Sequence, residues 1–308
     1  MTGLHSDFRM SQPNADVPLY EGPLTLTLKG RSSEFQGHVA LAWWPTPRIR
    51  FVAERPSVPD DLRLWIDSGP RSSDRLHIPG TAESVAVLPS TRELSDHGPL
   101  RFEGHLNAEL TLICAGPMVR VEGLVVNLSD YWSPGQRGAW CWEADDWKVT
   151  VSPVPGLTEL IKAVRRAGGY VITHRLAFER ADGASFSATD ADIVLHGLFR
   201  FLSFLQGRRV NVVLPVGYDS SGAPVWRKWL PWNVGAWQGV HSWADPLETD
   251  HLGEAFRGFM RLWAEPGWRD ALDAAIPGTQ TPIATPRFWR PARYSIRWRW
   301  SGLPGSIS

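Results

Sequence analysis

His174 and Arg175 are neighbours within residues 170–179, whose composition predicts a β-strand. Side chains alternate between the two faces of a strand, so His174 shares one face with apolar Ile172 and Leu176. An imidazole in such surroundings is either a buried general base or ligand contact, or a hydrogen-bonded histidine of the core. We favour the core histidine, and we take His174 and Arg175 as candidate ligand-binding residues.

Tryptophans are densest between residues 226 and 243. Trp226, Trp229 and Trp232 are spaced three apart, and Trp237 and Trp243 follow them. Exposed indoles at this spacing could stack on sugar rings or bases, whereas buried ones would pack where two domains meet. Packing is the favoured interpretation, but Trp226, Trp229 and Trp232 remain candidate ligand-binding residues.

Catalytic signatures are absent from the sequence. It contains no GxSxG elbow, no GxxxxGK phosphate loop and no GxGxxG after a strand. His251 and Glu254 lie three residues apart on a predicted helix, but a metal site needs three or four ligands. We therefore predict a protein that is not an enzyme, with no catalytic residue, no cofactor and no metal.

Charge and composition narrow the range of partners. The 308 residues include 32 Lys and Arg and 32 Asp and Glu, so the net charge is +0 and nucleic acid is an unlikely partner for residues 1–276. No apolar run approaches the roughly 20 residues needed to cross a bilayer, so we predict no membrane contact. The two cysteines, Cys114 and Cys141, lack CxxC spacing, which favours free, buried thiols in a reducing cytoplasm.

Residues 17–153 have the pattern of an antiparallel β domain. Residues 24–28 alternate Leu and Thr, and similar short runs recur up to residue 151. Gly, Pro and Ser clusters separate the runs, which is typical of a sandwich or barrel. Residues 1–16 are polar, and we predict a flexible N-terminus.

Residues 154–276 predict a second, α+β domain. Apolar positions predict a helix over residues 157–167 that ends at Gly168, and a buried helix over residues 190–206 with Thr189 as its N-cap. A hairpin over residues 210–229 and helices at 251–264 and 268–276 follow. The predicted fold class is thus α+β, with an N-terminal antiparallel β-sandwich or barrel followed by a mixed α/β domain.

The buried helix carries one polar stripe, at helical spacing. The stripe could line a pocket, but pairing with a neighbouring loop or exposure at the edge is the favoured interpretation. Its members are Asp192, His196, Arg200 and Ser203.

Residues 277–308 differ in composition from the rest of the chain. They hold five Arg, five Pro and three Trp with no acidic residue, and Pro277 interrupts a helix whose pattern is still running. Codons that could encode these residues, when read in a shifted frame, can give the peptides W-Y-x-N-A-N, F-L-E and A-L-E-R-L. These peptides contain acidic residues and have helical spacing. We predict an irregular tail and favour an out-of-frame origin over a natural low-complexity segment.

Several motifs resemble those of a family of uncharacterised bacterial proteins. They are WWPTP at residues 43–47, GYVITHR at 169–175, ERADG at 179–183, LSF at 202–204 and VGYD at 216–219. The resemblance implies a β-rich N-terminal region, an α/β segment and a helical C-terminal domain. In layout alone, it is similar to ApeA-type defence proteins, in which a helical HEPN domain is the RNase.

We therefore expect the non-catalytic recognition or scaffold portion of a larger bacterial protein with a role in defence, truncated or frameshifted near residue 276. Its partner would be another protein or the lost helical effector domain. One alternative is a stand-alone glycan- or protein-binding module that uses the tryptophan surface from Trp226 to Trp243. The other is a hydrolase centred on His174.

Overall fold

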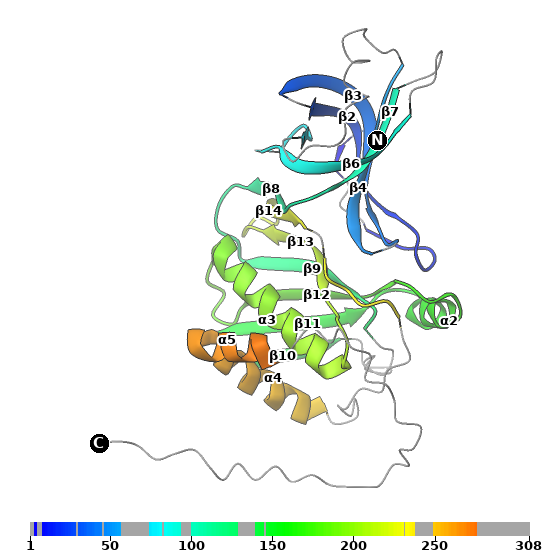
Figure 1. Cartoon of the computed structure of the whole chain (residues 1–308). Coiled ribbons are helices and arrows are strands. Elements are labelled where there is room, and N and C mark those ends of the chain that lie inside the picture. The colour runs from blue at the N-terminus through cyan, green and yellow to red at the C-terminus, as the bar shows by residue number, and fades with distance from the viewer. Residues whose placement is uncertain are drawn as a thin grey trace.

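The computed structural model combines a small barrel with a second sheet that carries helices on one face (Figure 1). All strand pairings of both sheets are antiparallel. The α+β class predicted from the sequence is confirmed in outline. The structure describes residues 3–4, 8–28, 30–44, 46–56, 74–81, 83–93, 100–128, 139–144, 146–230, 232–237 and 249–275.

The first sheet has the strand order β1-β2-β3-β4-β7-β6-β5, and an added pairing of β2 with β5 closes β2–β7 into a barrel. Alternating apolar residues fill its interior, as in Leu100–Leu106, where every second side chain is buried. Of the two predicted forms, the structure has the barrel. The strands are β1 (Gly3–Leu4), β2 (Val17–Leu28), β3 (Arg31–Ala42), β4 (Arg48–Arg55), β5 (Arg75–His77), β6 (Val85–Glu93) and β7 (Leu100–Leu106).

The second sheet has the order β10-β11-β12-β9-β13-β14-β8, so β12 lies between β11 and β9. Its strands are β8 (Leu110–Cys114), β9 (Arg120–Val126), β10 (Trp140–Ala144), β11 (Trp147–Pro153), β12 (Ile172–Arg180), β13 (Val212–Tyr218) and β14 (Pro224–Trp229). The chain therefore passes from the first sheet to the second between Leu106 and Leu110. This differs from the predicted division at residue 153, because β8–β11 pair with later strands. A period-2 pattern identifies a strand but not its partner.

Residues 8–16 are packed against the rest of the chain, which differs from the predicted flexible N-terminus. Phe8 and Met10 are buried. The Asn14 backbone donates to the Tyr170 carbonyl at 2.9 Å, its Oδ1 accepts from the Tyr170 backbone at 2.8 Å, and its Nδ2 donates to the Gly168 carbonyl at 3.1 Å. These partners lie more than 150 residues away along the chain, so no local pattern could indicate them.

Four helices are described: α2 (Leu157–Ala167), α3 (Ala188–Gln206), α4 (Thr249–Ala264) and α5 (Pro266–Ala275). α3 packs against β13 and α4 against β10, on the same side of the second sheet (Figure 1). The predicted helix over residues 157–167 is confirmed. The predicted N-cap Thr189 is wrong, because Ser187 and Asp190 exchange hydrogen bonds in a capping box two residues earlier.

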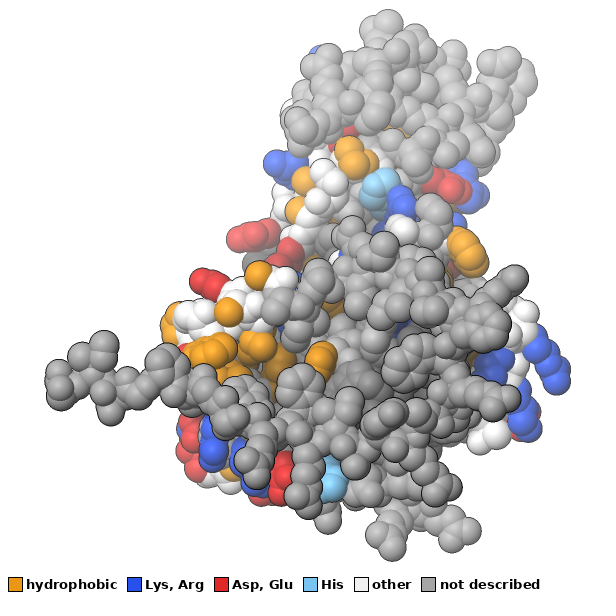
Figure 2. Space-filling view, turned by 60° about the horizontal axis from the view of Figure 1, so that its bottom comes forward, with side chains coloured by type: hydrophobic (Ala, Val, Ile, Leu, Met, Phe, Trp, Pro, Cys, Tyr) orange, Lys and Arg blue, Asp and Glu red, His pale blue; other side chains and the backbone are white. Residues whose placement is uncertain are grey.

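Two apolar cores stabilise the fold. One fills the barrel and continues onto the second sheet. Between the two, Trp43 stacks on Tyr170, which lies just before β12, with ring centroids 5.6 Å apart. The other lies between the second sheet and helices α3 and α4. Figure 2 shows further hydrophobic side chains on the surface at the helical end of the molecule, and Trp268 of α5 is 46% exposed.

Three remaining expectations concern the cysteines, the membrane and the tail. Cys114 and Cys141 are free but exposed, so their predicted burial is wrong. Cys114 is the last residue of β8, and Cys141 alternates with the buried Trp140 and Trp142 on β10. No helix among those described combines the length and apolarity that a membrane crossing requires. Residues 277–308, predicted to be an irregular tail, lie outside the described residues.

Candidate functional site on the open face of the second sheet

Strand β12 places His174 and Arg175 on opposite faces of the second sheet. His174 faces the helices and is fully buried, whereas Arg175 is exposed on the other side. We call that other side the open face; it carries the outward residues of β9, β11 and β12. The two neighbours therefore cannot act on one ligand, and each has to be judged by its own surroundings.

His174 is enclosed by apolar groups. Its ring stacks on Trp140 with centroids 5.8 Å apart, and neither ring nitrogen has a hydrogen-bond partner within the described structure. Burial lowers the pKa of His174 to about 3, so the imidazole is neutral at neutral pH. A general base works best with a pKa near the working pH, so this environment gives no support to a hydrolase centred on His174.

The tryptophan surface predicted as an alternative binding site is wrong. Trp226, Trp229 and Trp232 are 2%, 0% and 4% exposed. Residues three apart on a strand point to opposite faces, so Trp226 joins the core beneath the helices and Trp229 joins the core shared with the barrel. β14 also pairs on both sides, with β13 and β8, which leaves no exposed edge. Trp243 lies outside the described residues.

The polar stripe of α3 forms structural contacts. Asp192 accepts from Lys228 of β14 at 2.8 Å, and the same ammonium group lies 2.8 Å from Glu109. His196 and Arg200 both lie close to Asp273 of α5, at 3.1 and 2.6 Å. The favoured interpretation, pairing with neighbouring segments, is thus the observed one.

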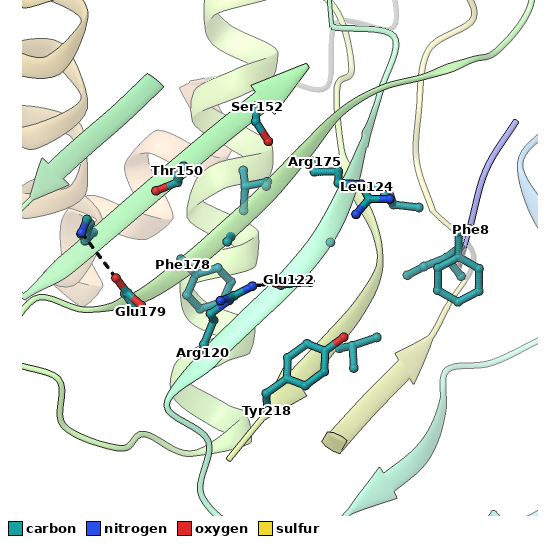
Figure 3. A pocket seen from close by; sticks show the side chains of 16 residues that line it. Phe8, Arg120, Glu122, Leu124, Thr150, Ser152, Arg175, Phe178, Glu179 and Tyr218 are labelled. Carbon is teal, nitrogen blue, oxygen red and sulfur yellow. Dashed lines mark ion pairs between the residues drawn. The ribbon is translucent and has the colours of Figure 1, made fainter. Parts of the chain in front are cut away.

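The open face holds a cavity of about 420 Å³ (Figure 3). Such a volume lies within the usual range for small-molecule sites. The cavity lies over four adjacent strands, and Phe8 stands at one end of it. The lining also includes Gly123 and the buried residues Leu176 and Phe178. The other lining residues on the four strands are Lys148, Thr150 and Ser152 of β11, Arg175, Ala177 and Glu179 of β12, Arg120, Glu122 and Leu124 of β9, and Leu214, Val216 and Tyr218 of β13.

Strand register arranges the lining in rows across the sheet. One row runs Lys148, Glu179, Arg120, Tyr218. Its charges are mostly paired, because Lys148 lies 3.6 Å from Glu179 and Arg120 forms an ion pair with Glu122. These paired charges form a polar end of the cavity.

A second row has a different character. It runs Ser152, Arg175, Leu124, and Leu214 of β13 lies beyond it. Register shifts between Val213 and Val216, and Leu214 has a φ of 54°, a left-handed conformation that is costly for a leucine. Bulges of this kind commonly redirect a side chain beside a binding site. Between the two rows lies Ala177, whose small side chain leaves the centre of the floor open.

Of the predicted candidates, only Arg175 lines the cavity. Sequence reasoning missed the other polar lining residues, although their signal was present. Lys148, Thr150 and Ser152 alternate with valines, and Arg120 and Glu122 flank Val121. What the sequence could not show was that these strands lie side by side. Among the described residues, no group of three or more His, Cys, Asp and Glu is placed to hold a metal ion.

Barrel, second sheet and helices together define an α+β protein with a pocketed antiparallel sheet. Residues 118–240 match the family model described as the YopA central domain. That range contains all of the cavity lining except Phe8, and it contains the GYVITHR, ERADG, LSF and VGYD motifs. No solved structure matches this chain.

The chain is also similar to the SPbeta prophage-derived uncharacterized protein YopA of Bacillus subtilis (strain 168). The two are 21% identical over 280 residues, which is 87% of this chain and 63% of the relative. This chain therefore corresponds to less than two thirds of the relative's length. Both findings support the predicted likeness to an uncharacterised bacterial family.

Proposed function

We propose that this chain is the non-catalytic recognition part of a larger bacterial protein and that it binds a small molecule in the cavity on the open face. The observation that carries the proposal is the cavity of about 420 Å³ itself. Four strands direct charged and polar side chains into it, while the other faces of the same strands form a core. A site that adds polar groups to a rigid sheet is suited to selective binding.

Binding without catalysis is supported by the state of the titratable groups. Lys148 with Glu179 and Arg120 with Glu122 form ion pairs, and His174 lies on the opposite face. Paired charges of this kind can hold a polar ligand in place through charge-assisted hydrogen bonds. We place this activity in the bacterial cytoplasm, where the free thiols of Cys114 and Cys141 would stay reduced.

The response to binding would come from a partner. The resemblance noted above implies a helical effector domain, and the ApeA-type layout suggests a defence role. The partner would be such a domain or a separate protein, and the open-face cavity would report the presence of its ligand to it. We assign no activity to that partner.

The test fills the cavity. Ala177→Trp places an indole at the centre of the floor, and Ala167→Trp, at the exposed end of α2, is the matched control. Each protein is dialysed to equilibrium against a bacterial small-molecule extract, and retained compounds are identified by mass spectrometry. Circular dichroism and thermal unfolding establish that the variants are folded.

We expect the wild type and Ala167→Trp to retain a compound that Ala177→Trp releases, and we expect its mass to be unchanged. Equal retention by all three proteins would refute the site. Conversion of the retained compound into a product over time would refute the non-catalytic assignment.

A further inference from the structure

We propose that the open-face cavity binds a neutral, polyhydroxylated ring of the size of a monosaccharide, seated over Ala177 and against the ion pairs Lys148–Glu179 and Arg120–Glu122. This inference rests on the proposed function, since it names the class of ligand for the same site. It is carried by the positions of these four charged side chains around the open centre of the cavity, by their exposure and by their pairing.

The two ion pairs lie side by side around Ala177 (Figure 3). Glu122 is the direct partner of Ala177 on β9, and Glu179 follows Ala177 by two residues on the same face of β12. Glu179 is in register with Lys148 on one side and with Arg120 on the other. Cross-strand partners have Cβ atoms roughly 5 Å apart, so the four charged groups border one gap. A ligand seated over the short side chain of Ala177 therefore lies within reach of both carboxylates.

The charged groups of both pairs are accessible. The four side chains are 36% to 50% exposed, and Lys148 lies 3.6 Å from Glu179, which is longer than a hydrogen bond. Ion pairs with this exposure attract each other weakly. An ammonium group has three donors and a carboxylate has about four acceptor sites, so one contact between them leaves both able to bind further groups.

The pairing favours hydroxyl groups over charged groups as ligands. A hydroxyl both donates and accepts hydrogen bonds, so one hydroxyl can donate to a carboxylate and accept from the cation paired with it. The ion pair then stays intact, and both hydrogen bonds are charge-assisted. A charged ligand group would attract one member of the pair and repel the other. Two adjacent pairs therefore suit neighbouring hydroxyls of one ring.

The remaining lining suits the same class of ligand. Thr150 is the cross-strand partner of Ala177 on β11 and adds a hydroxyl to the cavity. Tyr218 is in register with Arg120, and Figure 3 shows its ring in the lining beside that residue. A tyrosine offers an apolar ring that can cover the C–H groups of a sugar, and a hydroxyl at its tip. Arg175 already has an interaction of its own, so the proposal does not depend on it.

The experiment compares neutral sugars with charged forms of the same ring. Binding of D-glucose, D-galactose and D-mannose to the full chain is measured by isothermal titration calorimetry. Each hexose is matched with its uronate and with its 2-amino sugar, at a pH where the amine is protonated. At least one hexose should bind roughly tenfold or more tightly than both of its charged counterparts, because its hydroxyls bind the ion pairs without separating them.

Variants locate the bound hexose. Glu179→Gln and Glu122→Gln keep the shape of the side chain but replace an ionised acceptor with a neutral one, so each should weaken binding by roughly tenfold. Ala177→Trp should abolish binding. Glu159→Gln is the matched control, because Glu159 forms an exposed ion pair with Lys162 on α2, outside the cavity lining, and its substitution should leave the affinity unchanged. Circular dichroism establishes that each variant is folded.

The outcomes distinguish this inference from the proposed function. If none of the hexoses binds, or if a charged form binds as tightly as its neutral hexose, the ligand class is wrong. Binding that survives Ala177→Trp, or that neither glutamine variant weakens, would place the sugar elsewhere and overturn the inference as well. In each of these cases, the extract dialysis decides the proposed function separately.

Discussion

The second sheet has two faces built from the same strands, and they differ in almost every physical respect. Toward the helices, aromatic rings pack closely: Trp142 lies 5.7 Å from Phe201 and 5.3 Å from Phe256 between ring centroids. On the open face, charged and hydroxylated residues of β9, β11, β12 and β13 line a cavity together with a few apolar ones such as Leu124 and Val216. Stability is thus concentrated on one face, which leaves the other free to be selected for binding.

The test with the largest expected effect compares substitutions at two neighbouring residues on β12. Phe178 is 1% exposed and packs on Phe186 and Trp147 in the core beneath the helices, although it also contributes to the cavity lining, whereas the Glu179 side chain is 44% exposed in the cavity. We expect Phe178→Ala to lower the free energy of unfolding by about 3 to 5 kcal/mol through lost packing and a residual cavity. Glu179→Ala should cost less than about 1 kcal/mol. Urea unfolding measures both, and similar costs would contradict the division of roles between the faces.

A second test concerns polar groups within the buried side. Asn127 is fully buried at the end of β9 with a φ of 59°, and its side chain is satisfied. Its Nδ2 donates to the carbonyls of Gly169 and Gly235 at 3.0 and 2.9 Å, and its Oδ1 accepts from the Val171 backbone at 3.0 Å. We expect Asn127→Ala to cost about 2 to 4 kcal/mol, because the Val171 N–H and the Gly235 carbonyl lose the partner that Asn127 supplies, whereas the Gly169 carbonyl still accepts from the Trp237 backbone.

Asn127→Gly separates the contribution of the side-chain hydrogen bonds from that of the backbone conformation at this position. Glycine adopts a positive φ without strain, so this variant should be about 1 kcal/mol more stable than Asn127→Ala, although it lacks the same hydrogen bonds. Denaturant titration of both variants gives the difference. If the glycine variant is less stable than the alanine variant, the positive φ at residue 127 does not strain an alanine there, and the explanation is wrong.

The parts of this fold that local sequence determines were predictable. Helix α2 follows from a stripe of apolar residues and ends at Gly168, as expected, and the β12 strand follows from its composition. The alternation in β9, β11 and β12 also predicted strands with one buried face. These signals act over a few residues, where propensity and periodicity are informative.

What could not be predicted depends on contacts between distant residues. The pairing of β8 with β14 joins residues more than 110 positions apart, and that pairing buries Trp229. The cavity requires β11, β12, β9 and β13 to lie in that order, which no local pattern encodes. Arg175 was found because it adjoins His174, whereas Ser152 and Leu124 become visible as its neighbours only through the strand register.

A third test uses pH, because no described residue gives the His174 ring the hydrogen bonds that Asn127 has. Burial lowers the pKa of His174 from 6.5 to about 3. Between these values the unfolded chain holds a proton that the folded chain does not, so stability is full above about pH 6.5 and falls as the pH drops toward 3. We expect a loss of about 2 kcal/mol between pH 7 and pH 5, measured by urea unfolding.

His174→Phe should remove most of this loss while keeping the stacking on Trp140. The control is Gln36→Phe, because Gln36 is exposed on β3 and has no titratable group, so its substitution should leave the pH dependence of the wild type unchanged. If the unfolding free energy of His174→Phe falls with pH as steeply as that of the wild type, other groups cause the loss of stability.

The smallest expected effect lies on the open face, in the ion pair of Lys148 and Glu179. Their side chains are 41% and 44% exposed and the charged atoms are 3.6 Å apart, so water and salt should screen most of the attraction. A double-mutant cycle with Lys148→Gln and Glu179→Gln should give a coupling energy below about 1 kcal/mol, and 1 M NaCl should reduce it further. A larger, salt-insensitive coupling would require these charges to be shielded from solvent. The cavity would then be a closed polar interior, the two faces would share the work of stabilising the sheet, and a ligand would have to open that interior before it could bind.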